Sequence, residues 1–176
     1  MVIDIGTGTG QTVLRRARRE PHSLVIGVDA ETSAMAEASR RAAANVKKGG
    51  LPNALFLAES AELLPGALAG CADLVTVVLP WGSLLLGALC ADGAMIIALR
   101  GLLRADGEML LFLSDLERTQ VEGLATDYES AGLQMTELHP ATTADVAALS
   151  SGWARRLGIP GSRPAWIIRL KKSVSP

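Results

Sequence analysis

Short apolar runs alternate along this chain with longer stretches in which apolar residues recur at helical spacing. Continuous apolar runs are typical of strands buried in a sheet, and the helical spacing is typical of amphipathic helices. Strands are therefore predicted at Val2–Ile5, Leu24–Val28, Ala54–Leu57, Leu74–Leu79, Met109–Leu113, Leu133–Leu138 and Ala165–Leu170. Helices are predicted at Gln11–Arg19, Glu31–Asn45, Met95–Leu103 and Glu117–Ala131, with a short helical turn at Ala61–Leu64.

This succession predicts the fold class α/β, with a mostly parallel seven-stranded sheet and helices on both faces. The last two strands are joined by a polar connection that starts at Pro140, and they are expected to pair antiparallel. A doubly wound, Rossmann-like sheet that ends in an antiparallel hairpin is the class I methyltransferase variant, whereas nicotinamide-binding domains more often continue with parallel strands. The chain has 176 residues, and residues 1–176 are expected to form a single domain.

The stretch from Leu74 to Ala91 contains eighteen residues and no charge, which reaches the lower limit for a membrane span. Pro80, Gly82 and Gly87 interrupt it. A buried strand, a turn and a buried helix account for these residues better, so no membrane partner is predicted. Because the amino end shows no signal-peptide pattern, the protein is expected in the cytoplasm.

Cys71 and Cys90 lie nineteen positions apart, and neither has a Cys or His nearby at the spacing of a metal site. We therefore expect no bound metal and no disulfide, with both thiols reduced and buried. The net charge of −1 argues against binding to nucleic acid through bulk charge. From His139 to the end, however, six Arg or Lys stand against one acid, a local excess of five, which predicts one basic face.

The segment Asp4-Ile5-Gly6-Thr7-Gly8-Thr9-Gly10 closes the first predicted strand with an acid and three alternating glycines. Glycine tolerates positive φ and has no Cβ, so such a loop can turn tightly and lie against a ligand. Gly-x-Gly-x-Gly with an acid two positions ahead is typical of S-adenosylmethionine methyltransferases, whereas nicotinamide enzymes usually carry Gly-x-Gly-x-x-Gly. Asp29 and Ala61-Glu62 follow the next two strands, so all three pieces are expected at the ligand-binding carboxyl edge of the sheet.

Each acid in this group has more than one interpretation. Asp29 can accept the ribose hydroxyls of an adenosyl cofactor, or it can be a turn acid that caps the helix beginning near Glu31. Asp4 stands inside an apolar strand, where burial is costly without partners, and it is expected to organise the glycine loop or to face the methionine moiety. Glu62 can be a cofactor contact or a solvated helical acid.

Two tryptophans stand in unusual settings for a core built of aliphatic side chains. Trp81 lies in Leu79-Pro80-Trp81-Gly82-Ser83-Leu84-Leu85, a position where adenine-modifying methyltransferases commonly hold the target base, and Trp153 lies in Ser150-Ser151-Gly152-Trp153-Ala154-Arg155-Arg156-Leu157. These motifs resemble those of the 16S rRNA adenine-1408 N1 methyltransferases, aminoglycoside-resistance enzymes that modify the ribosomal decoding site. The resemblance also covers Asp4–Gly10, Val25–Asp29, Gly49–Phe56 and Ala72–Val77.

The resemblance implies that Trp81 and Trp153 stack on either face of a flipped adenine, with Ser151 near that base. It implies S-adenosyl-L-methionine as the cofactor, bound by Asp4, Gly6, Thr7, Gly8, Asp29, Ala61, Glu62 and Ser83. It implies rRNA contacts by Arg156 and Arg163 around the flipped nucleotide and by Lys47 and Lys48 from the linker before the third strand. The expected partner is 16S rRNA in the 30S subunit, bound by a monomer, and no DNA partner is expected. Because adenine N1 carries a lone pair at neutral pH, no general acid or base is assigned.

Other interpretations stay open at this point. Trp81 can be a packing residue at a strand end, Trp153 a surface or interface anchor, and Lys47-Lys48 a solvated helix end. The four arginines of the first helix are interpreted as a solvated face and not as RNA contacts: Arg15, Arg16, Arg18 and Arg19. For the whole protein, the alternatives are a methyltransferase for another RNA or a small molecule, and a non-catalytic homologue that binds S-adenosylmethionine or RNA.

Several features depart from the family pattern. The small amino-terminal hairpin of the family is expected to be missing, and Ser114–Leu133 is shorter than its family counterpart. Thr9 replaces an acid of the loop, and Gly158–Arg163 differs in spacing, which affects the alignment of Arg163. These departures are expected if the chain is truncated, if its start is misassigned, or if it is a reduced homologue whose docking to RNA is weakened.

Overall fold

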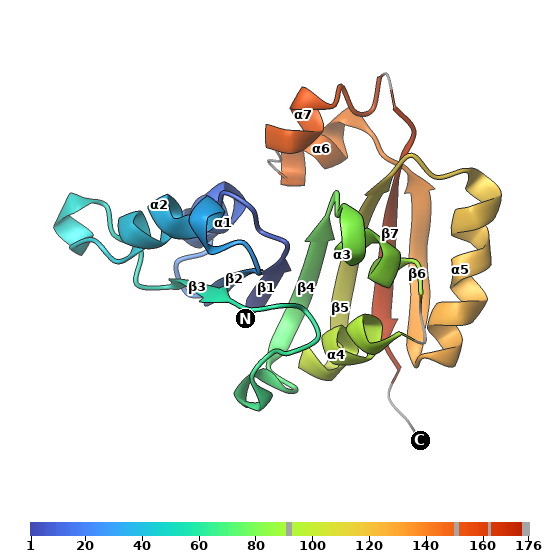
Figure 1. The fold of residues 1–176 in the computed structure, drawn as a ribbon, viewed down its shortest axis with the longest axis horizontal. Helices are drawn as coiled ribbons and strands as arrows, with labels where there is room; N and C mark the ends of the chain where they lie inside the picture. Colours follow the sequence, from blue (N-terminus) through green and yellow to red (C-terminus); the bar gives the residue numbers. More distant parts are fainter. Residues whose placement is uncertain (91–92, 150–151, 162, 174–176) are drawn as a thin grey trace.

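A single mixed sheet organises the protein in the computed structural model, which describes residues 1–90, 93–149, 152–161 and 163–173. Its seven strands have the order β3-β2-β1-β4-β5-β7-β6 (Figure 1). Strand β7 is antiparallel to both of its neighbours, β5 and β6, and the other described pairs are parallel. The strands are β1 (Val2–Ile5), β2 (Val25–Asp29), β3 (Ala54–Ala58), β4 (Ala72–Val78), β5 (Leu103–Ser114), β6 (Leu133–Pro140) and β7 (Ala165–Lys172).

Helices cover both faces of this sheet. The helices are α1 (Gln11–Arg19), α2 (Thr32–Ala42), α3 (Gly82–Ala88), α4 (Ala94–Leu102), α5 (Arg118–Ser130), α6 (Thr143–Leu149) and α7 (Gly152–Arg156), with single 3-10 turns η1 (Val46–Lys48) and η2 (Gly66–Leu68). Helices α1, α2, α6 and α7 pack on one face, and α3, α4 and α5 pack on the other. Helices α6 and α7 lie beyond the carboxyl end of β4 (Figure 1).

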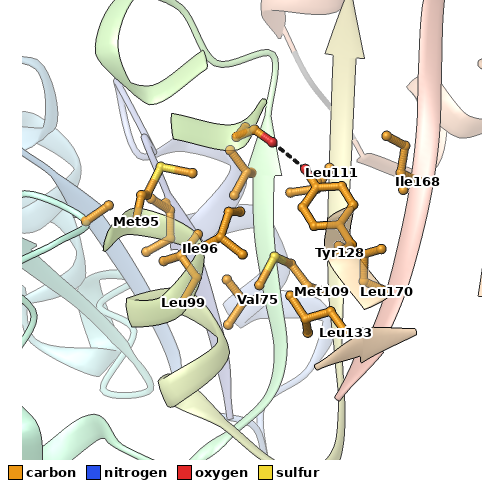
Figure 2. Packing of buried hydrophobic residues seen from close by; sticks show 14 of the residues in the cluster. Val75, Met95, Ile96, Leu99, Met109, Leu111, Tyr128, Leu133, Ile168 and Leu170 are labelled. Atoms are coloured by element: carbon orange, nitrogen blue, oxygen red, sulfur yellow. Dashed lines mark hydrogen bonds between the residues drawn. The ribbon is translucent and has the colours of Figure 1, made fainter. Parts of the chain in front are cut away.

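The alternation of side chains along β5 shows how one strand serves both layers. Leu110 and Phe112 point to α6 and α7, whereas Met109 and Leu111 point to α4 and α5. Figure 2 shows the second of these cores, in which Tyr128 of α5 is fully buried among aliphatic side chains. Its hydroxyl donates to the carbonyl of Ala88 at the end of α3, which ties α3 to α5 across the layer.

The predicted fold class is confirmed, including the antiparallel pairing of the last two strands. Helix α1 and strand β1 have the predicted bounds. Strand β5 begins at Leu103, so α4 ends one residue before the prediction and is followed directly by the strand. The helical turn predicted over Ala61–Leu64 was wrong, since that segment is an irregular turn, and the 3-10 turn of this connection is η2 at Gly66–Leu68.

Other local predictions were wrong. The helix predicted over Glu31–Asn45 ends at Ala42, because the Asn45 side chain accepts from the Lys47 amide and starts the separate turn η1. The polar connection after Pro140 contains two helices, α6 and α7, whose apolar residues are too few to show a period. Helix α3 is only partly buried, with Leu86 exposed.

The cysteines are a further correction, since Cys71 and Cys90 are both exposed. Cys71 directly precedes β4 and Cys90 lies two residues after the end of α3, so neither belongs to a helix or strand. Among the described residues, no helix is long and apolar enough to cross a membrane, and no cluster of His, Cys, Asp and Glu could hold a metal ion.

Candidate active site

The glycine loop connects β1 to α1 and places its backbone against open space. Its glycines have left-handed φ angles, 70° at Gly6, 55° at Gly8 and 67° at Gly10. The amides of Gly6 and Thr7 donate to the carbonyl of Val28 at 2.9 and 3.0 Å, which holds the loop against β2. A Cβ on Gly8 would meet no atom within 4 Å, so this backbone faces a space that a ligand can enter closely.

Asp29 ends β2 beside this loop and is half-buried. Its Oδ2 accepts from the Gly8 amide at 2.7 Å, and its Oδ1 accepts from the Glu31 amide at 2.9 Å. The cap of α2 is Glu31 and not Asp29, because Glu31 Oε1 accepts from the Ser33 amide at 3.0 Å. Each Asp29 oxygen can accept a further hydrogen bond, so the carboxylate is fixed in place with capacity left for a ligand's hydroxyls.

Asp4 is buried inside the sheet with 7% of its surface exposed. Three threonine hydroxyls donate to its carboxylate, from Thr7 and Thr12 at 2.9 Å each and from Thr76 at 2.6 Å. Burial raises the pKa of Asp4, and these hydrogen bonds act in the opposite direction. The carboxylate thus joins the loop, the start of α1 and strand β4, as expected for a residue that organises the loop.

Two adjoining cavities open at this edge of the sheet. The first, here called the Asp29 cavity, has a volume of about 320 Å³. Among the predicted residues, its lining includes Gly6, Gly8, Asp29, Ala61, Glu62, Trp81 and Ser83. Glu59 and Ser60 also line it, and the sequence prediction missed both because they stand in a short polar connection after β3 without a motif.

The second, here called the tryptophan cavity, has a volume of about 420 Å³. It is bounded by the glycine loop, one side of α1, the end of β4 and α7, with Trp81 and Trp153 both on its lining. Residues Gly6, Gly8, Leu79 and Trp81 line both cavities, so the two spaces meet at the glycine loop and at Trp81. A ligand that fills both would bring two reacting groups together at this junction.

The turn after β4 holds Trp81 in an exposed position through a strained backbone. Leu79 has a φ of 50°, although its side chain is buried and its amide donates to the Phe112 carbonyl at 2.7 Å. A left-handed conformation in a residue other than glycine costs on the order of 1 kcal/mol, which the buried side chain offsets. Gly82 then turns the chain into α3 with a φ of 57°.

The exposure of the three tryptophans separates their roles. Trp166 is 7% exposed, and its Nε1 donates to the Leu116 carbonyl at 2.9 Å, as a core residue should. Trp81 is 81% exposed and Trp153 is 51% exposed. A packing role for Trp81 is therefore excluded, since most of the indole has no protein neighbour. Trp153 is carried by α7, whose Ala154 is fully buried and anchors that helix on the sheet.

The remaining predicted residues lie in three different places. Arg156 lines the tryptophan cavity. Lys47 and Lys48 are exposed on η1, away from the linings of both cavities, and Arg163 Nη1 pairs with Asp115 Oδ2 at 3.2 Å. Ser151 lies outside the described residues. Arg15 lines the tryptophan cavity although the sequence interpretation placed it on a solvated helix face.

Comparison with known proteins identifies close relatives of this chain. The sequence model of the family described as "NpmA: 16S rRNA (adenine(1408)-N(1))-methyltransferase" matches residues 1–172. A 16S rRNA (adenine(1408)-N(1))-methyltransferase of Streptoalloteichus hindustanus is 38% identical over 173 residues, covering 89% of this chain and 80% of the relative. A protein of the same description from Streptoalloteichus tenebrarius is 35% identical, covering 100% of this chain and 88% of the relative.

Solved structures of 16S rRNA methyltransferases are also similar to this chain. A mutant of the 16S rRNA (adenine(1408)-N(1))-methyltransferase from Catenulisporales acidiphilia, crystallised with the cosubstrate SAM, superposes with a TM-score of 0.88 at 29% identity, covering 99% of this chain and 87% of that one. The structure of the 16S rRNA methyltransferase KamB gives a TM-score of 0.87 at 32% identity, with 98% and 87% covered.

Proposed function

Because the chain belongs to the 16S rRNA (adenine(1408)-N(1))-methyltransferase family, we propose that it transfers a methyl group from S-adenosylmethionine to N1 of adenine-1408 in 16S rRNA. The activity confers aminoglycoside resistance by altering the decoding site. The observation that supports this function most directly is the junction of two cavities at Trp81, one lined by the Asp29 carboxylate and one by the exposed indoles of Trp81 and Trp153.

The Asp29 cavity fits the adenosine part of the cofactor. Asp29 has acceptor capacity for both ribose hydroxyls, and the missing side chain of Gly8 leaves room for close approach to the backbone. Ala61, Glu62 and Ser83 stand on the same lining and would surround the adenine and ribose. Bound S-adenosylmethionine supplies an electrophilic methyl group on a sulfonium, and the shared lining of the cavities is where that group would lie.

The tryptophan cavity is suited to a flipped adenine. Stacking on an aromatic side chain stabilises a base by about 1 to 3 kcal/mol, and flipping a nucleotide costs a few kcal/mol, so two indoles can offset the cost. Trp81 belongs to the turn after β4 and Trp153 to α7, so the base would be held between two different elements.

The chemical step needs orientation more than proton transfer. Adenine N1 attacks with its own lone pair, the bond between sulfur and the methyl carbon breaks, and the positive charge passes from sulfur to the base. No general base is required, and alignment of N1 with the methyl group supplies most of the rate enhancement. The indole faces of Trp81 and Trp153 would also favour the developing cationic base through cation–π attraction.

Docking on the rRNA would use cations on the face that carries α1, α2 and α7. Arg156 stands at the cavity, and Lys47 and Lys48 project from η1. Arg163 would exchange its exposed partner Asp115 for a phosphate, at little cost because exposed ion pairs contribute roughly 0 to 1 kcal/mol. We propose the 30S subunit in the cytoplasm as the substrate and a monomer as the active form.

The decisive experiment incubates the protein with 30S subunits and labelled S-adenosylmethionine, followed by mapping of reverse-transcription stops. We expect a stop at adenine-1408 that disappears in Trp81→Ala and Trp153→Ala. The stop should be partly retained in Trp81→Phe and Trp153→Phe. Trp166→Phe is not a neutral control, because it removes a buried hydrogen bond. Cofactor binding by calorimetry with no transfer to subunits would contradict the proposal and favour a non-catalytic protein.

A further inference from the structure

Arg15 differs from the other arginines of α1 in where its side chain lies. It is half-buried and lines the tryptophan cavity together with Trp153 and Arg156, whereas Arg18 on the same helix is exposed. The interpretation of a solvated helix face therefore holds for Arg18 and is wrong for Arg15. An arginine on the wall of a substrate cavity needs a different explanation.

The cavity around Arg15 is rich in positive charge. Among the described residues, Asp4 is the only carboxylate on its lining. Asp4 accepts hydrogen bonds from three threonine hydroxyls, and its charge interacts with the positive charge of Arg16. Burial lowers the pKa of Arg15, and so does the positive charge of Arg155 and Arg19 nearby. Guanidinium groups gathered in this way repel one another, and a bound oxyanion would relieve the repulsion.

The position of Arg15 along α1 indicates which oxyanion it meets. It stands one helical turn beyond Gln11, so it lies about 6 Å farther along the axis than the helix start that faces the glycine loop. This places it toward Trp153 and Arg156 of α7 and away from the Asp29 cavity, where it is not part of the lining. A phosphate attached to the flipped nucleotide would lie on that side, whereas the cofactor's carboxylate would lie nearer to the loop.

We propose that Arg15 of α1 and Arg156 of α7 together grip the phosphate of the flipped nucleotide, with Arg15 acting from the inner wall of the tryptophan cavity. The proposal rests on the proposed function and adds a positioning residue to it. The planar guanidinium presents donors that match two phosphate oxygens at once, so the contact would fix the backbone of the nucleotide while the indoles hold its base. Base and backbone would then be located independently.

The test compares Arg15→Gln with Arg18→Gln, which removes an equal charge from the exposed side of the same helix. For each variant, kcat/KM for methylation of 30S subunits is measured over a range of salt concentrations, with the cofactor's Kd from calorimetry. Arg15→Gln is expected to lower kcat/KM roughly 10- to 100-fold and to reduce the salt slope by about 1. Arg18→Gln should change each by less than about twofold, and the cofactor's Kd should stay near wild type in both.

Three results would overturn the proposal. Equal effects of the two substitutions would assign Arg15 to general surface charge, and a cofactor Kd weakened by the same factor as kcat/KM would assign it to the cofactor's carboxylate. An unchanged kcat/KM in Arg15→Gln would show that Arg15 has no role in methylation. If Arg15→Gln lowers the Tm, Arg15→Lys decides instead, since it keeps the charge and should recover the salt slope with only part of the rate. A wild-type protein without methylation would refute the proposed function itself, and not this assignment alone.

Discussion

Single residues at the two cavities adopt states that are costly elsewhere in a protein. Asp4 is a carboxyl group inside a sheet, Leu79 has a left-handed backbone, and Trp81 exposes an indole. Each is supported by its neighbours, through three hydroxyl donors, a buried side chain and the turn into α3, respectively. Such costs are typical of binding sites, where the fold maintains strained or unpartnered groups.

The pH dependence of folding should report on Asp4. Its pKa is raised in the folded protein, so the native state binds a proton more tightly than the unfolded chain does. Between the unfolded pKa near 3.8 and the raised folded value, the stability contributed by this group falls as pH rises. Asp4→Asn removes the titration, and the difference in unfolding free energy between variant and wild type should therefore shift in favour of the variant as pH rises.

Urea unfolding of both proteins from pH 4 upward measures this difference. Replacement of the acceptor should itself cost about 1 to 3 kcal/mol at all pH values, because the amide offers fewer acceptor sites to the threonine hydroxyls. A difference that is constant with pH would show that Asp4 titrates alike in both states.

Part of this site could be predicted from residue types and their local pattern alone. Asp4, the glycines and Asp29 could be predicted because each stands in a local pattern at a strand end. Thr76 could not, since its hydroxyl reaches Asp4 from a position 72 residues away along the chain. Arg15 could not either, because its side chain is distinguished from Arg18 only by the cavity it meets.

A side chain in the connection before β3 holds together the elements that carry the site. The side-chain Nδ2 of Asn53, just before β3, donates to the carbonyls of Ala17 at 3.0 Å, Glu20 at 3.1 Å and Ser23 at 3.0 Å. One side chain thus secures the end of α1 and the turn into β2. These are the two elements that bear the glycine loop and Asp29.

Substitution of Asn53 should destabilise the protein in a graded way. Asn53→Ala leaves three carbonyls without this donor and should cost about 1 to 3 kcal/mol. Asn53→Asp should cost more at neutral pH, because a carboxylate would face the same carbonyl oxygens. Chemical denaturation of the three proteins gives the order, and an aspartate variant as stable as wild type would contradict the structure.

Two glycines, one at the start of α3 and one inside α5, allow a matched pair of substitutions. Gly82 has a φ of 57° with open space at its missing Cβ, whereas Gly123 in α5 has ordinary helical geometry and equally open space. Gly82→Ala should therefore destabilise by about 1 to 2 kcal/mol, and Gly123→Ala should stabilise by up to about 1 kcal/mol.

The same two substitutions should also differ in their effect on activity, measured as methylation of 30S subunits below the unfolding temperature. Gly82→Ala should lower the rate further than its stability explains, because the turn orients Trp81, and Gly123→Ala should leave the rate unchanged. Equal rates in both variants would mean that the orientation of Trp81 does not depend on this turn.

Across the molecule as a whole, charge is distributed unevenly although the net value is only −1. Arg156 belongs to α7 and Lys47 and Lys48 belong to η1, which follows α2, whereas Arg118 belongs to α5 on the face opposite α2 and α7. An rRNA that docks over the cavities would meet the first group alone. Binding should then depend on which cation is removed and not on total charge.

Salt titration of 30S binding checks this. The double substitution Lys47→Gln and Lys48→Gln should reduce the slope of log K against log salt concentration by about 1 for each phosphate that the lysines neutralise. Arg118→Gln, which removes one positive charge from the opposite face, should leave the slope unchanged. A similar change in both proteins would argue for binding by overall charge.

Local patterns in the sequence were sufficient to predict the type and order of the main elements, the antiparallel end of the sheet and the positive φ angles of the glycine loop. These features follow from hydrophobic period and backbone freedom, which act over a few neighbouring residues. Tertiary packing was needed to establish that Thr76 meets Asp4, that Arg15 enters the tryptophan cavity, that both cysteines are exposed and that two helices form after Pro140. Those facts depend on how distant segments pack across the sheet, and burial and neighbours at that range are not encoded in any local pattern.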